Sequence, residues 1–151
     1  MEEKIPPDTT EKTRIRVREL LKNMEAHGDS TTIKTILEAC GARCPFTHLP
    51  DEQLLTIKAE ATDPNDFLEM LCQKWRLKKE NDQYYVVFDK CYCPLVLDDT
   101  EEFSGTLCHC TLGNIKHKLR IGLGREIEVE MQKTILGGDD ECRFHLKIEA
   151  D

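Results

Sequence analysis

Two pairs of cysteines, each separated by one residue, are the part of this sequence with the clearest chemistry. The first pair is Cys91 and Cys93 in "KCYCPLV", and the second is Cys108 and Cys110 in "GTLCHCTLG". In an extended segment residues i and i+2 point the same way, so each pair presents two sulfurs to one side. A disulfide within a pair would be strained, whereas a tetrahedral zinc ion takes four thiolates. The spacing therefore predicts a zinc site shared by both pairs.

A third group of cysteines lies upstream of these pairs. Cys40 and Cys44 in "CGARC" stand at the expected end of a helix, with His48 four residues further on. Six clustered cysteines exceed one tetrahedral site, so we expect at least two of them to be spare, structural or reactive. Zinc is the expected cofactor, and an iron–sulfur cluster is the alternative. The candidate metal ligands are Cys91, Cys93, Cys108, Cys110, Cys40 and Cys44.

Each cysteine also has a structural interpretation. Buried or incidental thiols are the competing explanation for the doubled pairs, because Cys-x-Cys is a weaker zinc signature than Cys-x-x-Cys. Cys72 and Cys142 stand at core spacing among apolar residues, and free cysteine buries readily, so we expect both in the core. Cys110 falls where a helix should begin, and the positive end of a helix favours the thiolate that binds metal.

The composition indicates the class of protein and its surroundings. The chain has 151 residues, of which 39% are hydrophobic and 33% charged, as is typical of one globular domain. A formal net charge of -8 opposes contact with the phosphates of a nucleic acid. No apolar run approaches the roughly 20 residues of a membrane span, and the charged start lacks the apolar core of a signal peptide. We therefore expect a cytoplasmic protein with neither a nucleic-acid nor a membrane partner, in which clustered cysteines are ligands or reactive thiols rather than disulfides.

Apolar spacing divides the chain into a helical part and a sheet part. We expect a flexible arm over residues 1–10 and a single domain over residues 11–151, made of a helical part (11–76) and a sheet and metal-binding part (77–151). Gly28 should end the first helix, and Gly41 and Pro45 the second. The expected helices cover residues 10–28, 29–45, 49–61 and 63–75 at most.

Around residue 76 the apolar period changes from helical to alternating. "WRLKKENDQYYVVFDK" is typical of a hairpin, and "REIEVEMQKTIL" and "ECRFHLKI" alternate as half-buried strands. A further helix is expected over residues 111–124. The fold class is thus α+β, with a helical N-terminal half packed on a C-terminal antiparallel sheet that has one inserted helix. A pocket between sheet and helices would be lined by the aromatic core candidates Trp75, Tyr84, Phe88 and Phe144.

The C-terminal half resembles the small-molecule-binding domain of the 4-vinyl reductase family, which also occurs in regulators that respond to aromatic hydrocarbons. The resemblance rests on a cysteine-bearing segment before a glycine-containing helix, on the strand "LGREIEVE", and on the turn "GGDDECRF" that opens the last strand. With "CGARC" included, the chain is similar to an uncharacterised bacterial family close to 2-aminothiazoline-4-carboxylate hydrolase. The similarity covers roughly residues 35–149.

The resemblance implies an α+β domain that binds an apolar or aromatic small molecule between helices and sheet. It also implies zinc held by cysteines near the mouth of the pocket, with Cys108 or Cys110 matching the metal-ligand segment of the family. The doubled Cys-x-Cys and "CGARC" are additions to the family pattern. They leave the number and identity of the ligands open.

The expected function is a zinc-binding, ligand-binding sensor or carrier module without catalysis of its own. We also consider a homodimer as its assembly. One alternative is a cysteine-dependent hydrolase of a small cyclic amide or thiazoline, in which His48 or His109 acts as the base. The other alternative is an iron–sulfur protein.

Overall fold

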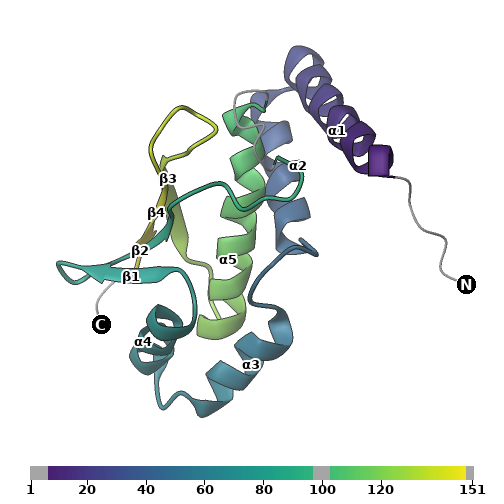
Figure 1. Cartoon of the computed structure of the whole chain (residues 1–151). Coiled ribbons are helices and arrows are strands. Elements are labelled where there is room, and N and C mark those ends of the chain that lie inside the picture. Colours follow the sequence, from purple (N-terminus) through teal and green to yellow (C-terminus); the bar gives the residue numbers. More distant parts are fainter. Residues whose placement is uncertain (1–6, 97–102, 149–151) are drawn as a thin grey trace, which may run out of the picture.

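The computed structural model describes residues 7–96 and 103–148, with side chains described from residue 11 onward. The expected α+β class is confirmed, with helices in the N-terminal half, an antiparallel sheet in the C-terminal half and one helix between its strands (Figure 1). In chain order, the elements are α1 (Pro7–His27), α2 (Ser30–Ala42), α3 (Asp51–Glu60), α4 (Pro64–Lys74), β1 (Leu77–Glu80), β2 (Gln83–Phe88), the short 3-10 helix η1 (Gly105–Cys108), α5 (His109–Leu123), β3 (Glu128–Lys133) and β4 (Cys142–Lys147).

Helix α1 begins earlier than its apolar spacing indicated. Its first residue, Pro7, falls within the arm expected over residues 1–10. Proline suits the first position of a helix, because its missing N–H needs no partner there and its φ is already helical. Residues 1–6 of the expected arm lie outside the described residues.

Capping side chains fix the starts of two further helices. Asp29 accepts a hydrogen bond from the backbone N–H of Thr32 at the start of α2, and Asp63 accepts one from Asp66 at the start of α4. The end of α2 differs from the prediction. The helix continues through Gly41 to Ala42, so Gly41 does not stop it.

The four strands form one antiparallel sheet in the order β1-β2-β4-β3. The β1–β2 hairpin turns at Asn81 and Asp82, both at positive φ, as a two-residue hairpin turn requires. Strands β2 and β4 pair with Val86 opposite Phe144, and both side chains are fully buried. Alternate residues of the two central strands therefore face the helices.

Helix α5 lies between the sheet and α2, at the centre of the molecule (Figure 1). Side chains on its two sides pack into two different apolar clusters. The first cluster joins the sheet to α3, α4 and α5 around Phe67, Leu71, Ile115 and Phe144. The second cluster joins α1 and α2 to the segment around η1 and consists of Leu21, Ile33, Leu37, Val96, Phe103 and Leu107. Within the described ranges, no helix combines the length and the apolar character needed to cross a bilayer.

Candidate functional site

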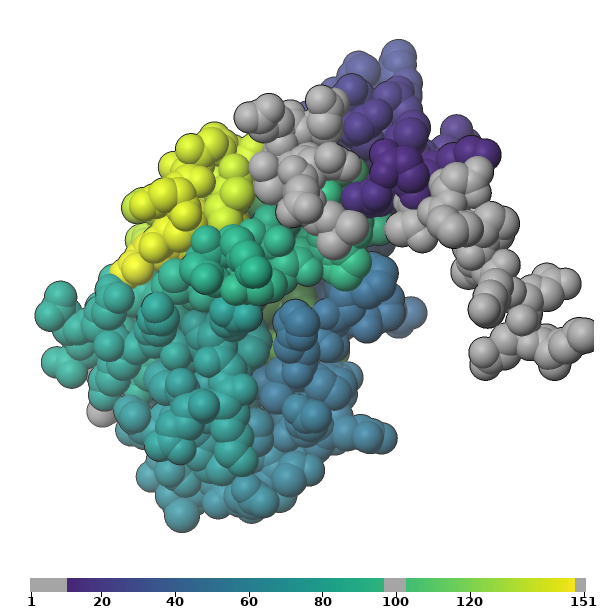
Figure 2. Space-filling model, in the orientation of Figure 1, coloured from purple at the N-terminus to yellow at the C-terminus, as the bar shows by residue number. Residues whose placement is uncertain are grey.

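A cavity lies where the two apolar clusters meet. Its volume is about 300 Å³, at the lower end of the range for small-molecule sites. Residues 44–48 and 90–95 line it, and the face of the molecule between these segments is hollowed (Figure 2). Apolar side chains from both clusters form much of the wall. They are Trp75, Phe88, Phe144, Leu107 and Leu136.

Seven of the eight cysteines line this cavity, and all eight lie in the part of the chain that the structure describes. They come from four places: the end of α2 and the turn after it, the segment after β2, the junction of η1 with α5, and the start of β4. Six of them are the predicted ligand candidates, Cys40, Cys44, Cys91, Cys93, Cys108 and Cys110. The seventh is Cys142, which was expected only as a core residue. Cys72 on α4 instead packs half-buried against the first cluster.

Local backbone hydrogen bonds turn two of these segments toward the cavity. After α2, the N–H groups of Arg43 and Cys44 donate to the carbonyls of Cys40 and Gly41, each at 3.1 Å. After β2, the N–H of Val96 donates to the carbonyl of Cys93 at 3.0 Å. Pro94 is the second residue of this turn and disfavours helical geometry at Cys93, the residue before it.

Close packing of α2 on α5 fixes the third segment. A Cβ built on Gly113 would lie 2.0 Å from the carbonyl oxygen of Glu38, so only glycine fits there. Lys116 bonds Glu38 at 2.6 Å, and the Asn114 amide donates to the carbonyl of Gly41 at 3.0 Å. These contacts hold the first turn of α5, with Cys110, against the end of α2, with Cys40.

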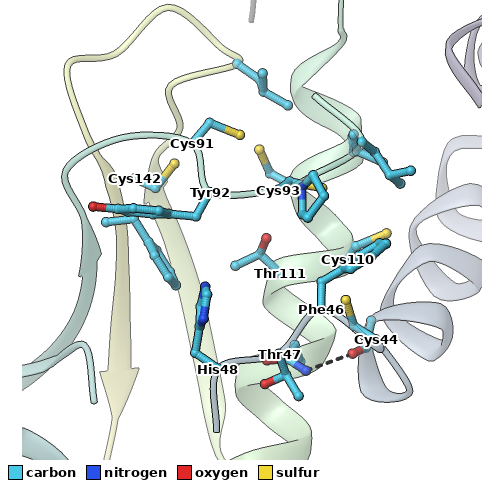
Figure 3. Close-up of a pocket in the computed structure, with 18 of the residues that line it drawn as sticks. Cys44, Phe46, Thr47, His48, Cys91, Tyr92, Cys93, Cys110, Thr111 and Cys142 are labelled. Atoms are coloured by element: carbon cyan, nitrogen blue, oxygen red, sulfur yellow. Dashed lines mark hydrogen bonds between the residues drawn. The ribbon is translucent and has the colours of Figure 1, made fainter. Parts of the chain in front are cut away.

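The sulfurs form two groups that are joined through Cys91 and Cys93, which also interact with each other. We name Cys91, Cys108 and Cys142 the inner thiol group. In Figure 3, Cys91 and Cys142 lie at one end of the cavity, and Cys44 and Cys110 lie toward the other. Interaction with Cys108 lowers the pKa of Cys142, and interaction with Cys142 together with burial raises the pKa of Cys108. The backbone N–H of Ile135 also donates to the Cys142 sulfur, at 3.4 Å.

The outer thiol group consists of Cys40, Cys44, Cys93 and Cys110. Burial raises the pKa of Cys110 to about 12, with further contributions from the sulfurs of Cys40, Cys93 and Cys44. Burial likewise raises the pKa of Cys93. Burial therefore acts against the expected effect of the helix start on Cys110, because loss of water around the sulfur disfavours the thiolate.

Sulfurs that share a cavity do not by themselves have the geometry that a metal ion needs from its ligands. Among residues 7–96 and 103–148, no group of three or more His, Cys, Asp or Glu side chains is placed so that it could hold a metal ion. Burial raises the pKa of Cys93 and Cys110, so zinc binding there would have to release their protons. The sulfurs share a cavity, and the arrangement described is one of thiols rather than of a preformed metal site.

A buried lysine braces the wall next to the outer thiol group. Lys118 on α5 is 2% exposed, and its ammonium donates to Thr47 Oγ1 at 2.6 Å and to Asn114 Oδ1 at 2.8 Å. It also lies 5.7 Å from the centre of the Trp75 ring. Burial lowers the pKa of Lys118 to about 8, opposed in part by Asp51 and Cys44. Because Thr47 and Asn114 both line the cavity, this network fixes the wall's shape.

Other residues singled out from the sequence divide between the cavity and its surroundings. His48 lines the cavity, and its ring stands edge-on to Tyr92. His109 is not among the lining residues, and burial lowers its pKa. Trp75, Phe88 and Phe144 line the cavity as the pocket hypothesis expected, whereas Tyr84 contacts Glu69 on α4 elsewhere. Sequence reasoning missed Lys118 and Asn114, although a lysine inside the apolar period of a helix was a visible signal.

Comparison with known proteins places the fold and the family. None of the curated proteins compared with the chain matches it. Among solved structures, the fold is similar to that of a trafficking protein particle complex subunit 3 from Naegleria fowleri, which is covalently bound to palmitic acid. The TM-score is 0.53 at 20% identity, over 95% of this chain and 98% of that one, so the likeness concerns the fold alone. A family model matches residues 3–150, and the chain therefore belongs to a family of unknown function, DUF6144.

Proposed function

We propose that this protein binds a small apolar molecule in the cysteine-lined cavity and acts as a sensor or carrier module without catalysis of its own. The observation that supports this most directly is the cavity itself. It occupies about 300 Å³ between two apolar clusters, and aromatic and aliphatic side chains form much of its wall. A concave apolar site with few polar groups favours an apolar ligand, since burial of the ligand's surface supplies most of the binding free energy.

Two polar side chains of the wall are already bonded within the protein. Thr47 and Asn114 already bond the buried ammonium of Lys118, and Asn114 also donates to Gly41. These side chains are engaged with the protein, so they offer a ligand little hydrogen bonding. The protein of similar fold from Naegleria fowleri is bound to palmitic acid. We therefore test two classes of ligand here, aromatic molecules and molecules with an alkyl chain.

Trp75 gives a direct test, because it is the single tryptophan of the sequence and lines the cavity. Bromobenzene and a brominated palmitic acid are the probes, since bromine quenches indole fluorescence only at short range. We expect saturable quenching of Trp75 by at least one probe, and relief of that quenching when the unbrominated compound is added in excess.

Two threonine variants separate binding in the cavity from binding elsewhere. Thr111 lies half-buried in the wall and is seen in Figure 3, whereas Thr35 is exposed on α2 and does not line the cavity. Thr111→Phe should fill part of the space and weaken binding about tenfold or more, or roughly 1.4 kcal/mol. Thr35→Phe should leave binding unchanged. Equal quenching in both variants, or unsaturable quenching in the wild type, would contradict the proposal.

Zinc binding, which the sequence predicted at Cys91, Cys93, Cys108 and Cys110, remains a separate prediction, and we propose the outer thiol group as its ligands. The outer thiol group, Cys40, Cys44, Cys93 and Cys110, has the right donor type, and zinc would convert its thiols to thiolates with release of protons. Elemental analysis of protein made in metal-replete cells is the test. About one zinc per chain that is lost in Cys93→Ser but kept in Cys72→Ser would support the prediction, and its absence from the wild type would end it.

The two alternatives stay predictions as well. The hydrolase needs a base beside a thiol, and His48 is the histidine of the expected pair that lines the cavity. Loss of turnover on alkylation of one cysteine would favour the hydrolase. A visible absorption band in the purified protein would favour the iron–sulfur cluster.

A further inference from the structure

One side chain with a permanent charge belongs to the wall of the cavity. Of the described residues that line it, Lys90 alone is a lysine, arginine, aspartate or glutamate. Lys90 follows the end of β2 and is exposed. Because it is both exposed and part of the wall, it lies where the cavity opens to water. A lysine in such a place packs its apolar stem along the wall and keeps its ammonium hydrated.

The ring of Tyr92 holds the ammonium of Lys90 beside the cavity. Lys90 Nζ lies 5.2 Å from the ring centre, within the range of a cation–π contact. The guanidinium of Arg76 lies 4.2 Å from the same ring centre, and the Tyr92 hydroxyl donates to the Asp89 carboxylate. Tyr92 itself lines the cavity and is seen in Figure 3. These contacts fix the ring, so the charge of Lys90 is kept close to the cavity wall.

Lys90 has no carboxylate partner of its own in the part of the chain that the structure describes. The carboxylate of Asp89 pairs with Arg76 at 3.6 Å and also accepts the hydrogen bond from Tyr92. Within residues 7–96 and 103–148, no carboxylate oxygen lies within ion-pair distance of the Lys90 ammonium. Two cations thus stand beside one anion, and this part of the wall keeps a positive charge that the described residues do not neutralise.

We propose that the ligand of this cavity ends in a carboxylate, which the ammonium of Lys90 binds at the opening while the apolar remainder of the molecule lies inside. The inference rests on the proposed function, because it adds a charged head to the apolar ligand proposed there. A carboxylate at the opening keeps part of its water, so it avoids the desolvation that an ion inside an apolar wall would suffer. A ligand with an ammonium head would meet a like charge at the same place.

The net charge of the chain does not prevent this contact. The formal net charge is -8, which repels an anion at long range. Salt at about 0.15 M screens exposed charges that are more than about 8 Å apart, so a bound anion responds mainly to the charges beside it. In the described part of the chain, the charged groups that contact Tyr92 are Lys90, Arg76 and Asp89, and their sum is positive.

Three probes with the same alkyl chain and different heads test the inference on reduced full-length protein. They are ω-bromodecanoic acid, ω-bromodecanol and ω-bromodecylamine, and the bromine at the apolar end quenches Trp75 when the chain enters the cavity. Lys90→Met removes the charge and keeps most of the apolar stem. The acid should bind about threefold or more weakly to this variant than to the wild type, whereas the affinity of the alcohol should not change. Added salt should reduce the loss for the acid, because Lys90 is exposed.

Lys78→Met is the matched control, because Lys78 is exposed on β1, does not line the cavity and carries the same charge. It should leave the affinities of all three probes unchanged, and Lys90→Glu should favour the amine over the acid. If the alcohol binds and the acid loses no affinity in Lys90→Met, or loses as much in Lys78→Met, this inference is overturned and the proposed function stands. Binding of none of the probes to the wild type would overturn both.

Discussion

Gly41 of α2 lies directly against the backbone of Cys110 on α5. A Cβ built on Gly41 would come 1.7 Å from the carbonyl oxygen of Cys110, far inside any real contact. The absence of a side chain at Gly41 is therefore what allows the two helices to bring their cysteines to one cavity. The opposing atom belongs to the backbone, so it has no rotamer by which to move away.

Replacement of Gly41 by alanine should separate the two helices. We expect Gly41→Ala to lower the free energy of unfolding by about 3 kcal/mol or more, since the clash is with backbone. Urea unfolding followed by circular dichroism measures this. Gly105→Ala is the matched control, because a Cβ there would have its nearest contacts at 3.5 Å. This substitution should lower the free energy of unfolding by at most about 0.5 kcal/mol. Equal losses in both variants would contradict the close approach.

The buried ammonium of Lys118 should make stability depend on pH. The pKa of Lys118 is about 8 in the folded protein, whereas the ordinary value for a lysine is 10.5, so between these values the unfolded chain holds the proton more strongly. Burial of the charged ammonium lowers the free energy of unfolding by its full amount below pH 8, and this loss becomes smaller as the pH rises toward 10.5. The free energy of unfolding of the wild type, relative to that of Lys118→Met, should therefore rise by about 3 kcal/mol between pH 8 and pH 10.5.

The pH measurement needs a control for the thiols, because burial raises the pKa of Cys93 and Cys110 in the folded protein. Those thiols are present in both proteins, so their contribution largely cancels in the difference between wild type and Lys118→Met. Lys34→Met, at an exposed position of α2, should show a difference from wild type that does not vary with pH. A flat difference for Lys118→Met as well would show that Lys118 is not buried as a charge.

An exposed aromatic residue at the cavity should contribute to ligand binding without contributing to stability. Phe46 lines the cavity yet is 46% exposed, and Leu55 on α3 is 54% exposed and lies outside it. Phe46→Ala should raise the dissociation constant of a bound probe about threefold to tenfold, because a ligand would bury the exposed part of the ring. Leu55→Ala should change neither binding nor the urea midpoint. A loss of stability in Phe46→Ala would assign the ring to the fold instead.

Local patterns account for the elements that were correctly predicted. The hairpin, the two alternating strands and the helices after Asp29 and Asp63 are specified by turn residues, caps and apolar period, all of which are local. Gly41 was interpreted as a helix stop and is instead a close helix contact. Both roles need a residue without a Cβ, so the sequence does not distinguish them.

The sequence predicted most of the cysteines that line the cavity, but not their protonation. Clustering along the sequence identified six of the cysteines that line the cavity. The prediction that residues i and i+2 point the same way was wrong for Cys108 and Cys110, because Cys108 ends η1 and Cys110 lies in the first turn of α5. The clustering missed Cys142, whose place in an alternating strand gives the same signal for core and for cavity wall. The protonation of Cys110 was also missed, since burial arises from segments distant in sequence.

The central claim is that an apolar molecule occupies the cysteine-lined cavity. The most direct measurement is the set of nuclear Overhauser effects between unlabelled bromobenzene and the methyl groups of isotope-labelled protein. The account predicts contacts to Leu107 and Leu136, which line the cavity, and none to the exposed Leu20 and Leu55. Contacts confined to Leu20 or Leu55, or no contacts at saturating bromobenzene, would contradict it.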